Sequence, residues 1–151
     1  MSMVADVDTS QIVAIATEVF AAMIDRETGH LSEGSSVLMT LSDPLYAWVE
    51  LSTVPASRVQ LTTDVDTAGD LTHAFLSMDE AEPVVGADVM DAFGEIANVF
   101  GGSIKALLPE HVQLTLPQVS RRSPSGSAAV RLNEALLAWH GRLLVISLWT
   151  I

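Results

Sequence analysis

The chain has 151 residues, of which 49% are hydrophobic and 17% are charged, and it contains no cysteine. This length suits one domain, and folding at this size buries roughly two-thirds of the surface of the unfolded chain. No apolar run approaches the roughly 20 residues that cross a bilayer, so we expect no membrane span. Without cysteine there is no disulfide framework, and we expect a cytoplasmic protein.

The net charge of −12 is unevenly distributed along the chain. Residues 1–100 hold two basic and 17 acidic residues (net −15), whereas residues 101–151 hold five basic and two acidic residues (net +3). Binding to nucleic acid needs clustered Lys and Arg, and only Arg121 and Arg122 are adjacent. We interpret that pair as part of a solvated loop and expect no nucleic-acid partner.

The hydrophobic patterns predict one α+β domain over residues 1–151, with residues 1–8 flexible. Asp8, Thr9 and Ser10 are candidate N-caps for the first helix, and the dipeptide His140-Gly141 predicts the turn of a hairpin. The expected architecture is an antiparallel sheet packed with helices, in the order α-β-β-β-α-α-β-β-β. The expected elements are helix 11–24, a meander of strands 35–42, 45–52 and 58–63, helices 67–78 and 86–108, and strands 111–119, 128–139 and 142–151.

The last predicted strand contains a segment, 143–151, that has no charged residue. A long uncharged strand at the edge of a sheet invites aggregation. We therefore expect this strand to be central in the sheet, covered, or paired across a dimer.

No metal site is predicted from the residues that could bind one. The four histidines, His30, His73, His111 and His140, are far apart in the sequence and lack ligand spacing. Residues 64–70 resemble the start of a twelve-residue calcium loop. The twelfth position of such a loop requires a glutamate, and in this chain that position is Phe75. A helix start at Asp66 or Thr67 explains this stretch better.

The predicted helix 86–108 separates into two faces. Its apolar residues recur at helical spacing and predict a buried stripe: Val89, Phe93, Ile96, Phe100, Ser103 or Ile104, and Leu107. The opposite stripe is polar and must face solvent or a partner: Asp88, Asp91, Glu95, Asn98, Gly102 and Lys105.

Two features of this helix are unfavourable for helix stability. Asp91 and Glu95 are like charges at positions i and i+4, which is mildly destabilising. Gly101 and Gly102 each cost roughly 1 kcal/mol relative to alanine in a helix interior. A helix selected only for stability would use alanine and lysine here, so these residues indicate a binding surface.

The pattern Asp91-x3-Glu95-x2-Asn98, followed by the glycine pair and a strand ending in Pro117, resembles the signature of the CheC/CheX family of chemotaxis phosphatases. One copy of the signature makes the chain more similar to CheX than to CheC, which typically has two. In the first helix, Ala21 stands where a second copy would carry its asparagine.

The resemblance implies an α+β CheX/CheC-like fold and a phosphatase that acts on the aspartyl phosphate of a CheY-type response regulator. It implies that Asn98 positions the attacking water and that Glu95 pairs with the lysine of the receiver domain. Asp91 would add a supporting contact, and Gly101 and Gly102 would give clearance for insertion into the receiver. No cofactor is expected on this chain, because the Mg²⁺ belongs to the phosphorylated receiver.

The alternative is a module that binds a receiver without hydrolysis, related to the flagellar switch proteins FliM and FliY. The presence of an amide at Asn98 favours the enzyme, because docking alone does not need it. The resemblance also implies a homodimer, and the uncharged segment 143–151 fits either a homodimer or the central strand of a monomer.

Overall fold

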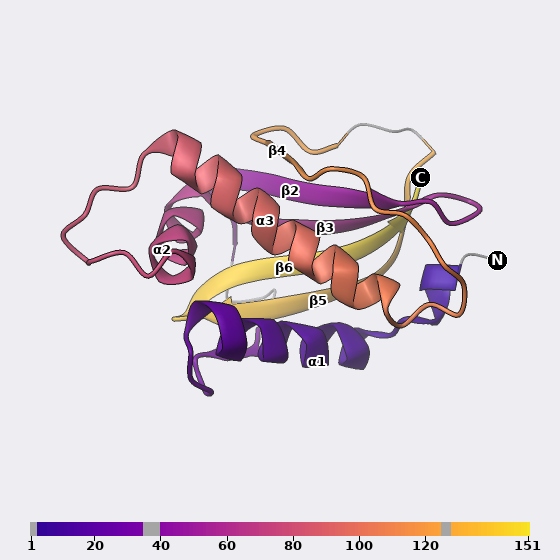
Figure 1. Cartoon of the computed structure of the whole chain (residues 1–151), viewed down its shortest axis with the longest axis horizontal. Coiled ribbons are helices and arrows are strands. Elements are labelled where there is room, and N and C mark those ends of the chain that lie inside the picture. Colours follow the sequence, from indigo (N-terminus) through magenta and orange to yellow (C-terminus); the bar gives the residue numbers. More distant parts are fainter. Residues whose placement is uncertain (1–2, 35–39, 125–127) are drawn as a thin grey trace.

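The computed structural model describes residues 3–34, 40–124 and 128–151. Its strands are β1 (Leu31–Glu33), β2 (Pro44–Leu51), β3 (Ser57–Asp64), β4 (Gln118–Ser120), β5 (Val130–Trp139) and β6 (Arg142–Thr150). They form one antiparallel sheet in the order β1-β5-β6-β3-β2-β4 (Figure 1). The uncharged segment therefore lies in a central strand, β6, and its burial needs no second copy of the chain.

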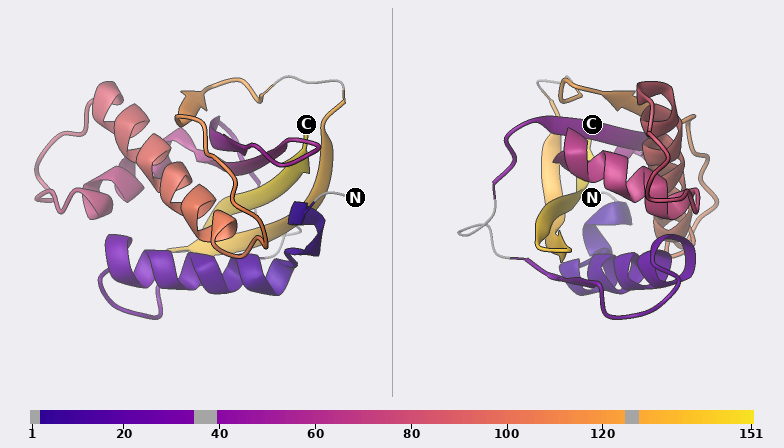
Figure 2. Two further views of the ribbon diagram at one scale, coloured as in Figure 1. Left: turned by 45° about the vertical axis from the view of Figure 1, so that its right-hand side comes forward. Right: turned by 90° about the vertical axis from the view of Figure 1, so that its left-hand side faces the viewer.

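The helices cover one face of this sheet (Figures 1 and 2). They are a 3₁₀ turn η1 (Met3–Asp6), α1 (Thr9–Val19) with a π-helical continuation η2 (Phe20–Ile24), α2 (Val65–Phe75) and α3 (Gly86–Lys105). Asp8 begins α1 with a capping box: its carboxylate accepts a hydrogen bond from Gln11 N, and the Gln11 side chain accepts one from Asp8 N. Between the helices and the sheet lies the core, whose largest fully buried side chains include Phe20, Phe93 and Phe100.

The predicted fold class and the predicted order of helices and strands are confirmed. The final hairpin turns at His140 and Gly141, whose φ angles of 49° and 75° give the left-handed backbone of a tight hairpin turn. Alternation along β5 and β6 sends Leu137, Leu144 and Ile146 into the core. Hydrophobic periodicity therefore predicted this part of the fold correctly.

Two predicted strands are not formed as expected. Of the range 35–42, residues 35–39 lie outside the described residues and 40–42 are not in a strand, while the first strand is the earlier β1. β1 pairs with β5 at the far edge, so the three strands are not a meander. Within 111–119, only Leu114 bridges β2 before β4 begins at Gln118, because Pro117 cannot donate a ladder hydrogen bond.

The expectation that residues 1–8 are flexible differs from the structure of residues 3–8. Val4 and Val7 are buried in the core. The side-chain amide of Asn133, on β5, donates a hydrogen bond of 2.6 Å to the carbonyl of Val7. Burial of these two valines and the tertiary hydrogen bond connect residues 4–7 to the core.

Helix α3 lies close to the sheet at two glycines on one flank. A Cβ at Gly101 would stand 2.4 Å from Cγ2 of Val49 on β2, and a Cβ at Gly94 would stand 3.2 Å from Cγ2 of Val119 on β4. Gly101 is therefore buried, and its missing side chain lets the helix approach β2. This corrects the prediction that Gly101 gives clearance for a partner. At Gly102, nothing lies within 4 Å of the Cβ position.

The two adjacent glycines give a matched test of this packing. Gly101→Ala should lower the free energy of unfolding by about 1–3 kcal/mol, because the methyl group overpacks against Val49. Gly102→Ala should raise it by up to about 1 kcal/mol, because alanine favours the helix and meets open space. Urea unfolding of both variants measures the difference, and equal effects at the two positions would contradict the packing described.

Candidate functional site

The polar stripe predicted on α3 faces away from the core. Asp91 and Glu95 are exposed, and Asn98 is half-buried. The opposite side of the helix is buried, with Phe93, Ile96, Phe100 and Ile104 in the core, although the predicted inward residue Leu107 is 44% exposed. The amphipathic pattern of α3 therefore placed the polar side chains correctly.

Three polar side chains of this stripe have no partner within the part of the chain that the structure describes. No hydrogen bond or ion pair engages the side chains of Asp91, Glu95 or Asn98. Glu95 and Asn98 are three positions apart on one helix, so they project from one face about one turn apart. A carboxylate and a carboxamide in this arrangement can enter a partner's pocket together, the first accepting hydrogen bonds and the second both donating and accepting them.

The other predicted site residues separate into two groups. Gly102 lies on the polar stripe with open space around it, one turn beyond Asn98. Gly101 lies on the inner flank against β2, as described above. Lys105, at the last turn of α3, is the one basic residue of the stripe.

Neither the role of Gly94 nor the path of the segment that follows α3 was predicted from the sequence. Pro117 lies 3.6 Å from the Cβ position of Gly94, and Leu114 lies 3.3 Å from that of Gly101. This segment therefore returns along the flank of α3, beside the polar stripe (Figures 1 and 2). Two glycines seven positions apart, which is close to two helical turns, were the signal in the sequence.

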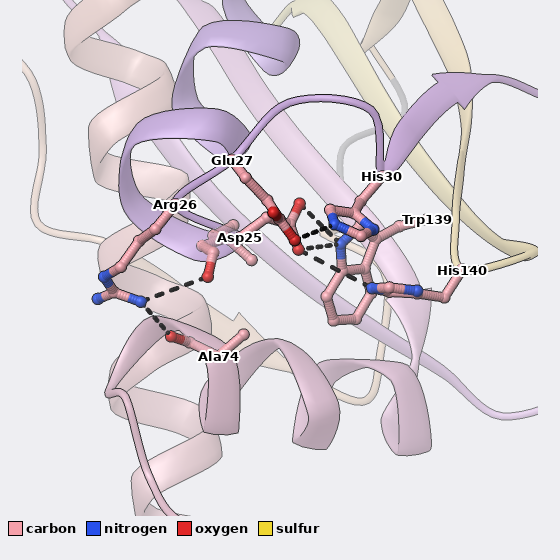
Figure 3. Close-up of polar contacts among 8 residues, drawn as sticks. Asp25, Arg26, Glu27, His30, Ala74, Trp139 and His140 are labelled. Carbon is pink, nitrogen blue, oxygen red and sulfur yellow. Dashed lines mark hydrogen bonds and ion pairs between the residues drawn. The ribbon is translucent and has the colours of Figure 1, made fainter.

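A second group of polar side chains lies where the end of η2 meets the β5–β6 turn (Figure 3). The indole N–H of Trp139 donates to both carboxylate oxygens of Asp25, at 3.0 and 3.2 Å. The imidazole of His30 donates to Glu27 at 2.6 Å, and its ring centroid lies 5.1 Å from that of His140. The fold thus brings together two histidines that are 110 residues apart in the sequence.

The same corner of the molecule also fixes the end of α2. The guanidinium of Arg26 donates to the carbonyl oxygen of Ala74 at 2.9 Å (Figure 3). It also donates to the carbonyl oxygen of Phe75 at 3.4 Å. A hollow of about 590 Å³ adjoins the cluster, and His73 lines it. Among the described residues, no group of three His, Asp or Glu side chains could hold a metal ion. We interpret this cluster as a structural connection between η2, α2 and the hairpin.

The connection makes the stability of the protein depend on pH through His30. The hydrogen bond to Glu27 raises the pKa of His30 above its ordinary value of 6.5. The protonated His30 therefore stabilises the folded protein. This contribution is fully present below about pH 6.5, the pKa of an ordinary histidine, and it is lost as the pH rises through the higher pKa of His30 in the folded protein. In Glu27→Gln the pKa of His30, measured by NMR titration, should fall toward 6.5. An unchanged pKa would contradict this assignment.

Comparison with known proteins identifies relatives of the chain. The family described as "Chemotaxis phosphatase CheX" matches residues 45–137. No curated protein sequence matches the chain. In addition, none of the helices among the described residues is long and apolar enough to cross a membrane.

Solved structures share the fold at low sequence identity. Chemotaxis protein CheX from Vibrio vulnificus is 15% identical with a TM-score of 0.67, and the match covers 91% of each chain. The CheX–CheY–BeF3–Mg²⁺ complex from Borrelia burgdorferi gives 14% identity and a TM-score of 0.67, covering 95% of this chain and 97% of the other. FliY from Thermotoga maritima gives 14% identity and a TM-score of 0.55, and the match covers 95% of this chain and 89% of the other.

Proposed function

Because the chain belongs to the CheX family of chemotaxis phosphatases, we propose that it accelerates dephosphorylation of a CheY-type receiver domain. The observation that carries this proposal is the free pair of Glu95 and Asn98 on the outer face of α3. A relative with the same fold has been crystallised with CheY, BeF3 and Mg²⁺, which supports a receiver as the partner.

The chemistry needs little from this chain. An aspartyl phosphate is a reactive acyl phosphate, and the receiver brings its own Mg²⁺ and lysine to the reacting group. Water attacks the phosphorus, the bond between phosphorus and the aspartate oxygen breaks, and inorganic phosphate and a free carboxylate are formed. What remains to be supplied is a water molecule in line with that bond, which is catalysis by positioning.

Asn98 is suited to hold that water. The carboxamide oxygen can accept a hydrogen bond from the water, and the carboxamide nitrogen can donate one. A neutral amide also adds no negative charge beside the phosphoryl group, which a carboxylate would do.

Glu95 and Asp91 supply recognition in this proposal. The exposed carboxylate of Glu95 pairs with the receiver's lysine, and this charge-assisted contact orients the two proteins. Asp91, one turn nearer the start of α3, adds a supporting contact. Gly102 leaves room for the receiver next to Asn98, since nothing lies within 4 Å of its Cβ position.

A module that binds a receiver without hydrolysis is the second candidate. It is favoured by the shared fold of FliY from Thermotoga maritima and, more distantly, of the FliM middle domain from Vibrio alginolyticus, with a TM-score of 0.52. Docking alone would explain Glu95 and Asp91 but not the amide of Asn98, so we favour the enzyme.

Asn98→Ala tests the catalytic role. We expect the rate of receiver dephosphorylation to fall about a hundredfold or more, the scale seen when a reacting group is misplaced. Folding should be intact, because the Asn98 side chain makes no hydrogen bond or ion pair among the described residues. The measurement is the decay of phosphorylated receivers from the same genome, with wild type and variant at equal concentration.

The control for this experiment is Asp88→Ala, a change at the start of the same stripe. Asp88→Ala should retain most of the activity. Wild-type turnover by Asn98→Ala would contradict the mechanism. Tight binding of a receiver by the wild type without faster decay would favour the adaptor.

Glu95→Lys tests recognition separately from chemistry. Reversal of the charge places a lysine against the receiver's lysine, and like charges at close range repel. We expect KM for the phosphorylated receiver to rise at least tenfold, with a smaller effect in Glu95→Gln. Unchanged KM and kcat in Glu95→Lys would remove Glu95 from the site.

A further inference from the structure

Leu116 is an apolar side chain that lies in the open beside the polar stripe of α3. It is 86% exposed. In contrast, Val112 and Leu114 lie four and two residues earlier in the chain, and Val112 is buried in the core while Leu114 packs against it. Single exposed leucines are ordinary on protein surfaces. The importance of Leu116 depends on where the fold holds it.

Two contacts with α3 locate Leu116. Leu114 lies against Gly101, and Pro117 lies against Gly94. Three extended residues span about 10 Å, and the seven residues of helix between the glycines span about 10.5 Å. The segment therefore runs antiparallel to α3 along its flank.

Leu116 is one residue before Pro117 on this segment. Because one extended residue spans roughly 3.3 Å, Leu116 lies about that far from the level of Gly94, in the direction of Gly101. On the helix, Glu95 lies roughly 1.5 Å and Asn98 roughly 6 Å from Gly94 in the same direction. Leu116 is thus level with the turn of α3 that carries both residues of the proposed site.

The backbone around Leu116 is held in place before any partner binds. Thr115 N donates to the carbonyl of Glu50 at 2.9 Å, and Glu50 N donates to the Thr115 hydroxyl at 2.9 Å. Pro117 on the other side restricts the backbone of Leu116 to extended conformations. A backbone that is fixed beforehand need not be ordered when the partner binds, so less of the free energy gained by burying Leu116 is lost to ordering.

We propose that Leu116 is a contact residue for the receiver, and that it packs against an apolar patch beside the receiver's lysine and phosphorylated aspartate. The proposal rests on the function proposed above. An exposed leucine level with Glu95 along α3 fits a partner whose cation and apolar side chain lie next to each other. Burial of Leu116 removes water from around the Glu95–lysine pair and strengthens that attraction. A few residues carry most of the affinity at an interface, and they do so where the partner desolvates them fully.

The test separates binding from chemistry. KM and kcat for dephosphorylation are measured for wild type, Leu116→Ser and Leu116→Met with the same phosphorylated receiver. We expect Leu116→Ser to raise KM about tenfold or more with kcat within about twofold, and Leu116→Met to stay within about twofold in both. Val130→Ser is the matched control, because Val130 is also an exposed aliphatic residue (58%), at the first residue of β5.

The same variants distinguish failure of this proposal from failure of the proposed function. A KM of Leu116→Ser equal to that of wild type, with thermal unfolding unchanged, overturns the role of Leu116 while the phosphatase stands. If the wild type binds a receiver treated with beryllium fluoride but does not accelerate the decay of the phosphorylated receiver, the dissociation constant replaces KM and the expectation for each variant is the same. Absence of binding to any receiver of the genome overturns both proposals.

Discussion

The close approach of α3 to β2 and β4 is the constraint on which the candidate site depends. Gly94 and Gly101 remove two side chains from the flank of the helix that meets Val49, Leu114, Pro117 and Val119. The helix can then bury Phe93, Ile96 and Phe100 under its other side. Because this flank and the buried side of α3 are both fixed, the helix cannot rotate about its axis. The directions of the side chains of Glu95 and Asn98 are therefore set as well.

The charge of the stripe limits what it can do chemically. Asp88, Asp91 and Glu95 repel a phosphoryl group, and Lys105 is the single basic residue of the stripe. Such a surface cannot stabilise the charge of a transferring phosphoryl group by itself. It can act only on a phosphate already neutralised by its carrier, which is the situation in a receiver that holds a cation and a lysine. The acidic stripe and the choice of a neutral amide at Asn98 are thus consistent with each other.

Sequence periodicity predicted the parts of the fold that depend on local pattern. The two faces of α3 and the β5–β6 hairpin follow from spacing, and the central place of β6 is one of the three placements that its lack of charge allowed. The missed features depend on tertiary contacts: the burial of Val4 and Val7, the pairing of β1 with β5, and the short extent of β4. The role of Gly101 was misread for the same reason, because only the position of Val49 shows that the glycine serves the core. The proximity of His30 and His140 was also inaccessible, since strand order decides it.

The order of strands also has a consequence for how the protein is made. β6 pairs with β3, and the hydroxyl of Thr63 donates to the carbonyl of Leu143, 80 positions later. At synthesis rates of roughly 5–20 residues per second, β3 waits several seconds on the ribosome with an open edge. Through that interval the apolar side chains of β2 and β3 have no completed sheet to join. The nascent chain therefore exposes for a time an edge that the finished sheet covers, and transient exposure of this kind favours aggregation.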